Sequence, residues 1–187
     1  MSGIVNQTGA RSGVIGTTVG SVDLAGHVLK VTSNTKLDTF STDQVDTDVT
    51  GFTGTITPNV ATSKILVMVS CSLAGGASST QGHIKLLRQV ASGSFAVIGG
   101  GTATGSNRKS AIAQSAADST QHSNQVGYSF LDSPSFTLGQ AINYKITASA
   151  QTPVGNYYVY IGLTANDDDS AYISRMPSTI TLMEIAQ

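Results

Sequence analysis

The chain has 187 residues, of which 40% are hydrophobic and 11% are charged, and its formal net charge at pH 7 is −1. This length fits one domain with its own core, and the charged fraction is less than half of the roughly 25% that is usual for soluble domains. The few Lys and Arg side chains are scattered, so the chain lacks the basic patch of a nucleic-acid-binding protein, and this class of function is excluded.

The composition predicts an all-β fold. Glu184 is the only glutamate, whereas Thr, Ser, Val and Gly are abundant, and these residue types favour strands and turns over helices. A surface with so little charge is typical of secreted or virion proteins, or of proteins covered by neighbouring subunits. We expect both conditions to hold for this chain.

Residues 1–26 are predicted to form an extended, glycine-rich N-terminal arm. Glycines recur between single or paired aliphatic residues, and such a segment loses too much conformational entropy to order by itself. We therefore expect the arm to order only against a partner. Its candidate contact residues are Ile4, Val5, Arg11, Val14 and Ile15.

The N-terminus also lacks the features of a targeting segment. It has no basic region followed by a continuous apolar stretch, and no run in the chain approaches the ~18 apolar residues of a membrane span. The sequence therefore predicts synthesis in a cytoplasm, no secretion through a signal peptide and no membrane partner.

The strand pattern begins after the arm. Residues 27–32 alternate as a strand does, residues 34–36 are predicted as a turn, and a Thr- and Asp-rich stretch follows to residue 50. That stretch lacks the spacing of a calcium-binding loop, so a solvated loop or edge is favoured and no metal is assigned. Another strand ends at residues 54–58, and the apolar run of residues 64–72 predicts a buried central strand.

Further strand candidates follow at regular intervals. Residues 82–90 predict a half-buried strand with a bulge at the Leu-Leu step, and residues 95–98 complete a hairpin with it. Residues 99–123 predict a long polar loop with one short strand near Ile112. Four more strands are predicted at residues 124–131, 141–148, 156–163 and 178–185. Eight or so strands at this spacing predict a jelly-roll-like antiparallel β-sandwich over residues 27–187.

No catalytic constellation is apparent. The glycine-rich stretch of residues 99–110 has no lysine where a phosphate-binding loop needs one and no helix after it. The three histidines are far apart, no Gly-x-Ser-x-Gly elbow occurs, and residues 167–169 form an acidic run that is more plausible as a charged turn than as a catalytic pair. Cys71 lies in the apolar run and is predicted to be buried and unreactive. The chain is therefore predicted to be no enzyme and to hold no cofactor.

Two features remain as candidates for binding. Distal loop residues with polar or aromatic side chains could contact a polar partner such as a glycan; these are Asn107, Arg108, Lys109 and Tyr172. In a strand Tyr158 and Tyr160 share one face, which fits packing in a core or interface and, with less support, a platform for sugar stacking. The absence of tryptophan weakens the sugar-stacking alternative.

The order of several segments resembles a known module. They are Tyr128-Ser129-Phe130-Leu131-Asp132-Ser133-Pro134, Ile142-Asn143-Tyr144-Lys145-Ile146, Tyr158-Val159-Tyr160-Ile161, Asn166-Asp167-Asp168 and Ser178-Thr179-Ile180-Thr181-Leu182-Met183-Glu184-Ile185. Together they resemble the C-terminal β-sandwich module of structural proteins of marine and cyanobacterial tailed phages, such as capsid decoration, head-fibre and short tail-fibre proteins. More loosely, the resemblance covers most of residues 60–187.

The resemblance implies a virion protein that forms a homotrimer and has no enzymatic activity. The expected role is that of a decoration or cement protein, or of a short head fibre, on the particle surface and attached through its N-terminal arm to the major capsid protein or another virion protein. The chain has no long repetitive shaft, so a long tail fibre is not expected. The alternative is a tail-fibre or spike protein that binds a host surface glycan through residues 74–82, 99–123 and 165–176.

Overall fold

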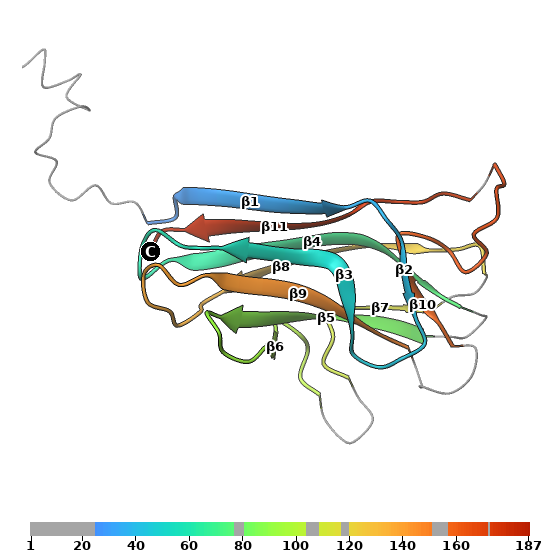
Figure 1. Ribbon diagram of the computed structural model, residues 1–187, viewed down its shortest axis with the longest axis horizontal. Helices are drawn as coiled ribbons and strands as arrows, with labels where there is room; N and C mark the ends of the chain where they lie inside the picture. The colour runs from blue at the N-terminus through green and yellow to red at the C-terminus, as the bar shows by residue number, and fades with distance from the viewer. Residues whose placement is uncertain (1–24, 77–80, 104–108, 117–119, 151–156, 172) are drawn as a thin grey trace, which may run out of the picture.

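The structure is a computed structural model that describes residues 25–76, 81–103, 109–116, 120–150, 157–171 and 173–187. Within these residues the chain contains no helix, and its strands form two antiparallel sheets that face each other (Figure 1). The predicted all-β sandwich is therefore confirmed. The strands are β1 (Val28–Lys36), β2 (Phe40–Thr42), β3 (Thr47–Ile56), β4 (Lys64–Gly75), β5 (Gln81–Val90), β6 (Ala96–Ile98), β7 (Ala113–Ala116), β8 (Asn124–Asp132), β9 (Ile142–Ala150), β10 (Val159–Ile161) and β11 (Ser178–Ile185).

Each sheet has four rows of strands. In sheet A, β1 and β2 share the first row, β11 and β10 share the second, and β4 and β8 follow. In sheet B the rows are β3, β9, β5 and a last row shared by β6 and β7. We count each row as one strand, although some rows consist of two segments, and we number the eight rows in the order in which the chain forms them. The order of rows across sheet A is then 1-8-3-6, and the order across sheet B is 2-7-4-5. This is the strand order of a jelly roll, as the sequence predicted.

The core lies between the two sheets. Every second residue of the central strands points inward, as in β11, where buried and half-buried positions alternate along the whole strand. The largest buried side chains come from both sheets, among them Phe52 and Tyr144 from sheet B and Ile65 and Leu182 from sheet A. The run of residues 64–72, predicted as a buried central strand, is the first part of β4.

The structure corrects two local predictions. Residues 34–36, predicted as a turn, continue β1, because the Asn34 side-chain amide donates to the carbonyls of Gly51 and Thr53 at 2.9 Å each and uses its hydrogen-bonding capacity across the sandwich. The predicted bulge in residues 82–90 is absent. β5 pairs with β9 residue by residue from Gly82 to Val90, so the Leu-Leu step places one leucine in the core and the next outside.

Side chains of β1 cover the free edge of β3. Besides Asn34, the Lys30 ammonium donates to the carbonyl of Thr57 at 2.9 Å, and the Thr32 hydroxyl donates to that of Thr55 at 3.2 Å. An unpaired strand edge is a template for aggregation, and charged or polar caps remove it. This side of the sandwich is therefore closed by hydrogen bonds that join the two sheets.

The opposite side of the sandwich carries a buried charged group. The Asp132 carboxylate at the end of β8 accepts hydrogen bonds from the Tyr144 hydroxyl on β9 and from the Arg88 guanidinium on β5, both at 2.7 Å. Asp132 is 3% exposed, and burial, followed by the charge of Asp132, raises the pKa of Tyr144 well above its usual range. The three side chains join sheet A to sheet B.

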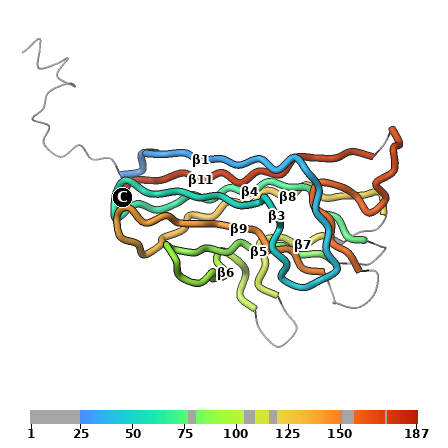
Figure 2. Tube along the Cα trace, viewed as in Figure 1, coloured from blue at the N-terminus to red at the C-terminus, as the bar shows by residue number. Residues whose placement is uncertain are grey.

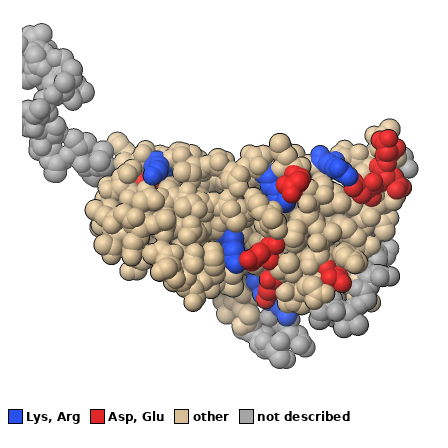
Figure 3. Space-filling model, viewed as in Figure 1, with Lys and Arg blue, Asp and Glu red and all other residues tan. Residues whose placement is uncertain are grey.

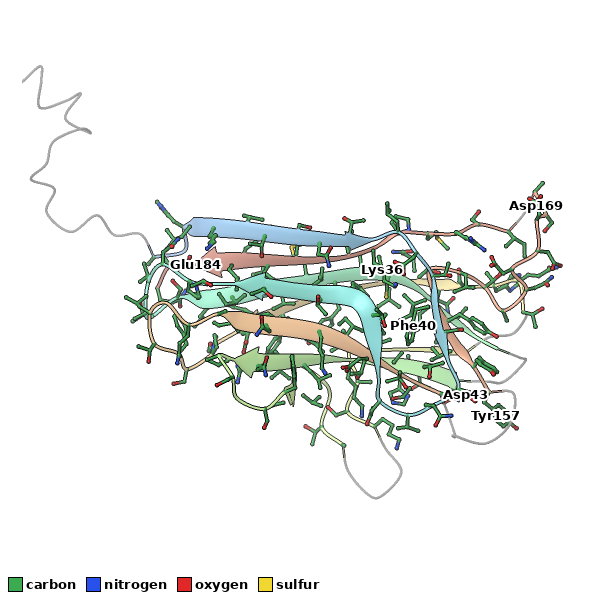
Figure 4. The ribbon with its side chains drawn as sticks, in the orientation of Figure 1. Lys36, Phe40, Asp43, Tyr157, Asp169 and Glu184 are labelled. Carbon is green, nitrogen blue, oxygen red and sulfur yellow. The ribbon has the colours of Figure 1, made fainter. Side chains whose placement is uncertain are left out.

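Glu184 fixes the connection between β3 and β4. Its Oε1 atom accepts hydrogen bonds from the backbone amides of Asn59 and Val60, at 2.7 and 3.0 Å, and from the hydroxyl of Ser63 at 2.8 Å. The side chain is completely buried in β11, toward the end of the molecule where β1 begins (Figure 4). The single glutamate of the sequence thus satisfies the donors of a turn that has no strand partner for them.

Gly82 lies where β5 of sheet B packs closely against β10 of sheet A at the loop end. A Cβ atom at this position would lie 2.4 Å from Cγ2 of Val159 on β10. We expect Gly82→Ala to lower the free energy of unfolding by about 1–3 kcal/mol, since the sheets would have to separate. Gly127→Ala is the matched control, because nothing lies within 4 Å of its Cβ position. Equal urea midpoints for the two variants would contradict this packing.

Cys71 provides a prediction on pH. Burial raises the pKa of its thiol from 9.0 to about 12, so the unfolded chain loses this proton near pH 9 while the folded chain keeps it. Deprotonation of the thiol therefore stabilises the unfolded state at a lower pH than it affects the folded state. The free energy of unfolding should fall between pH 8 and pH 10, by about 1 kcal/mol from this group. Urea titrations at both pH values should show a smaller fall for Cys71→Ala. An identical fall in the variant would show that Cys71 does not contribute.

Candidate functional site

Most of the residues singled out in the sequence lie outside the described part of the chain. These are Ile4, Val5, Arg11, Val14, Ile15, Asn107, Arg108 and Tyr172. Lys109 is described; it is exposed and stands shortly before β7. The site must therefore be sought on the surfaces of the sandwich that the structure describes.

The sandwich has two different ends. At one end the chain enters β1 and leaves β11: the amide of Gly26 donates to the carbonyl of Ala186 at 2.8 Å, and the amide of Ala186 donates to that of His27 at 2.9 Å. The connection from β10 to β11 lies at the opposite end, where β4 ends and β5 and β8 begin (Figure 2). Ala25 and Gln187 therefore lie at one end of the described sandwich, and the connection from β10 to β11 lies at the other.

β10 and β11 lie in the same row of sheet A, and the chain leaves this row after β10 and returns to it at β11. We call this connection the excursion. Its base is closed at Gly162, whose amide donates to the carbonyl of Ser72 at 3.2 Å and whose carbonyl accepts from the amide of Met176 at 3.0 Å. Gly162 has a φ of 79°, and a Cβ atom there would lie 3.0 Å from the Met176 carbonyl oxygen, so this close approach needs glycine. Residues 163–171 and 173–175 are thereby held at the loop end.

A hollow of about 440 Å³ lies where this excursion meets the segment before β8. The amide of Asn166 donates to the carbonyl of Thr120 at 2.9 Å and joins the two segments. The hollow is lined by Gln121, His122, Ser123, Asn124, Thr164, Ser174 and Met176. Among the described residues, the lining carries amides, hydroxyls, an imidazole and a thioether but no carboxylate, lysine or arginine, so it suits a neutral ligand with many hydroxyl groups.

An acidic hollow of about 250 Å³ lies on the same excursion, around residues 167–170. The Arg175 guanidinium pairs with the Asp167 carboxylate and holds the pKa of that group below its usual value. The amide of Ser170 donates to the carbonyl of Asp168 at 2.9 Å, so the acidic run forms a turn, as predicted. Within the described residues no group of three or more His, Cys, Asp or Glu side chains could hold a metal ion.

Three tyrosines in or just before β10 lie at this end too: Tyr157, Tyr158 and Tyr160. The rings of Tyr158 and Tyr160 are 6.0 Å apart between centroids and tilted by 31°, which confirms that the two residues share a face. Tyr157 and Tyr158 are 43% and 37% exposed. None of these three tyrosines is among the described residues that line the neutral hollow.

The outer face of sheet B carries charged side chains that form ion pairs with one another. Lys85 pairs with Asp46 at 2.6 Å, and Lys145 pairs with Asp48 at 2.7 Å. Figure 3 shows acidic and basic side chains next to one another in the half of the molecule away from the C-terminus. On the same face His83 is buried, and desolvation, followed by the charge of Lys85, lowers the pKa of its imidazole. Charges matched in this way leave little attraction for a charged partner.

The outer face of sheet A is different. The outward side chains of its rows are apolar or carry hydroxyl or amide groups, and the charged exception is Lys64 at one end of β4. Val28, Val31, Met68 and Leu131 are between 40% and 53% exposed on this face. A shallow hollow of about 250 Å³ lies between Ser70 and Gly127, where the small residues leave the sheet uncovered.

The sequence could not have indicated the neutral hollow. Its lining comes from residues 121–124 and from Thr164, Ser174 and Met176, which no local motif connects. The sequence indicates only that residues 99–123 and 165–176 are polar loops. Their convergence depends on the jelly-roll order, which brings the row of β10 and β11 within one strand of β8.

Comparisons with known proteins give structural neighbours only. No family model and no curated protein matches the chain. The structure is similar to chains of infectious bursal disease virus: the Gx strain (TM-score 0.41, 12% identity, 91% of this chain and 40% of that chain), the Gt strain (0.42, 14%, 91% and 41%) and the VP2 subviral particle (0.40, 12%, 91% and 41%). The chain thus spans about two fifths of the length of these neighbours.

No helix in the described residues is long and apolar enough to cross a membrane.

Proposed function

We propose that this chain is a non-enzymatic structural protein of a tailed-phage particle. In this proposal it is a trimeric decoration or cement protein, or a short head fibre, at the particle surface. Its partners are further copies of itself and the major capsid protein or another virion protein. The N-terminal arm makes the attachment, and the sandwich projects from the particle.

The observation that carries the proposal is that the two ends of the sandwich differ. Residues 1–24 join the described chain at one end, beside Ala186, and the connection from β10 to β11 lies at the other (Figures 1 and 2). A sandwich that is anchored at one end and presents this connection at the other is suited to standing on a surface. Jelly rolls are common among capsid domains, and the low-charge surface fits contact with neighbouring subunits.

Deletion of residues 1–24 tests the attachment. The cut is placed before Ala25 because the amide of Gly26 pairs with Ala186 and belongs to the folded body. Full-length protein should co-sediment with capsids that lack it, and the deletion variant should remain in the supernatant while keeping the β-sheet circular dichroism spectrum of the folded protein. Equal co-sedimentation of both proteins would contradict attachment through the arm, and a monomeric mass in light scattering would contradict the trimer.

A second candidate function is recognition of a host surface glycan by a tail fibre or spike. The neutral hollow between Thr120 and Met176 supports it, because amide and hydroxyl groups match sugar hydroxyls and the hollow lies at the end away from the arm. Ser174→Trp would fill the hollow, and Thr50→Trp on the exposed surface of β3 is the matched control. If this function holds, host adsorption should be lost in the first variant only. Unchanged adsorption in both would remove it.

A further inference from the structure

The outer face of sheet A, described above, exposes apolar side chains that nothing in the described residues covers. Its most exposed members, Val28 and Val31 in β1 and Leu131 in β8, are 52%, 53% and 47% exposed. Transfer of such side chains out of water is favourable, so a chain segment with aliphatic side chains that can reach this face would be stabilised on it.

The N-terminal arm enters the described structure at the border of this face. Ala25 precedes Val28, which stands opposite Ile185 at the same end of sheet A. The arm is thus tethered within a few residues of the apolar surface. Tethering by a short flexible link gives an effective concentration in the millimolar range, which favours an arm of the same chain over one from another molecule.

The spacing of apolar residues in the arm matches the position of the shallow hollow. The distance along β11 from Ile185 to Thr181, which borders the hollow, is about 14 Å. The rows from β1 to β8 are together about 14 Å wide, so a diagonal path across the face is about 20 Å long. Ile15 stands ten residues before Ala25 and can reach about 33 Å. The pair Val14-Ile15 therefore reaches the hollow with slack for a turn.

The arm also has the right chemistry for this surface. Between Gly13 and Leu24 the only charged residue is Asp23, and the other side chains are aliphatic or carry hydroxyl groups, like those of the face itself. Gly13 and Gly16 flank Val14-Ile15, and residues without a side chain allow the backbone to approach a sheet closely. Ile4, Val5 and Arg11 precede this stretch in the sequence and remain for contact with a partner.

We propose that residues 13–24 cross the outer face of sheet A of their own chain and seat Val14-Ile15 in the hollow between Ser70 and Gly127. The arm then has two parts: a strap that covers the apolar face, and a free tip, residues 1–12. This assignment does not rest on the proposed function, and it is tested on the free protein without any particle.

Disulfide trapping tests the strap directly. In a Cys71→Ala background, which removes the only native thiol, Val14→Cys is combined with Ser129→Cys at the hollow or with Thr50→Cys on β3 as the matched control. Both partner positions are exposed. Under diamide oxidation, the first pair should form an intramolecular disulfide at least tenfold faster than the control pair, at a rate independent of protein concentration. Equal rates would overturn the proposal, and so would disulfides formed only between molecules.

A substitution in the hollow supplies an independent test. Gly127→Leu fills it without strain, because nothing lies within 4 Å of the Cβ position. Deuterium uptake in residues 13–24 should rise severalfold in this variant and stay unchanged in Thr50→Leu, while both keep the melting temperature of the parent within a few degrees. Unchanged uptake in Gly127→Leu would overturn the proposal, whatever the outcome of the particle-binding experiment.

Discussion

Replacement of Glu184 by Ala is expected to lower the free energy of unfolding by about 3–5 kcal/mol. The carboxylate is completely buried and accepts from two backbone amides and one hydroxyl in the connection between β3 and β4. Hydrogen bonds to a charged group contribute about 1.5–3 kcal/mol each, and the donors left behind would be buried without partners. Urea denaturation followed by circular dichroism measures the change.

The control variant is Glu184→Gln, which keeps an acceptor for Asn59, Val60 and Ser63 but places an amide where Oε2 has no hydrogen-bond partner. We expect a loss of about 1–3 kcal/mol, smaller than that of the alanine variant. If Glu184→Ala lost less than about 1 kcal/mol, the connection would not depend on this carboxylate.

Asp132→Ala is expected to cost about 3–4 kcal/mol, because it leaves the Arg88 guanidinium and the Tyr144 hydroxyl without their shared partner between the sheets. Tyr144→Phe removes one of the two hydrogen bonds and should cost about 1–2 kcal/mol. The same urea titrations measure both variants.

A double-mutant cycle separates this network from simple loss of packing. If Asp132 and Tyr144 act together, the double variant should lose less than the sum of the two single variants, by about 1 kcal/mol or more. Additive losses would show that the hydrogen bond between them contributes nothing of its own.

The alternation of residue types was sufficient to predict the sandwich. The apolar run of β4 and the strict alternation of β11 identify two neighbouring central rows, and the predicted hairpin of β5 and β6 is present. Strand spacing predicted the jelly-roll class. These features depend on local periodicity, which a sequence displays directly.

Features that depend on tertiary contacts could not be predicted. Asn34 has the chemistry of a turn residue, yet it lies in β1 because the edge of β3 offers two carbonyl groups to its amide. Glu184 was conspicuous as the only glutamate, but its role as a cap for residues 59–63 depends on a neighbouring connection far away in sequence. β10 is three residues long, too short for its pattern to show that it shares a row with β11.

In the function that we propose, the sandwich stands on a phage capsid by its arm end. Particle imaging of capsids, and separately of tails, after mixing with the purified full-length protein tests this placement. We expect density at regular capsid lattice positions, with the end that holds Gly26 and Ala186 against the shell and the connection from β10 to β11 outward (Figure 4 labels Asp169 in this connection). Binding to tails alone, or capsid density with the loops against the shell, would contradict it.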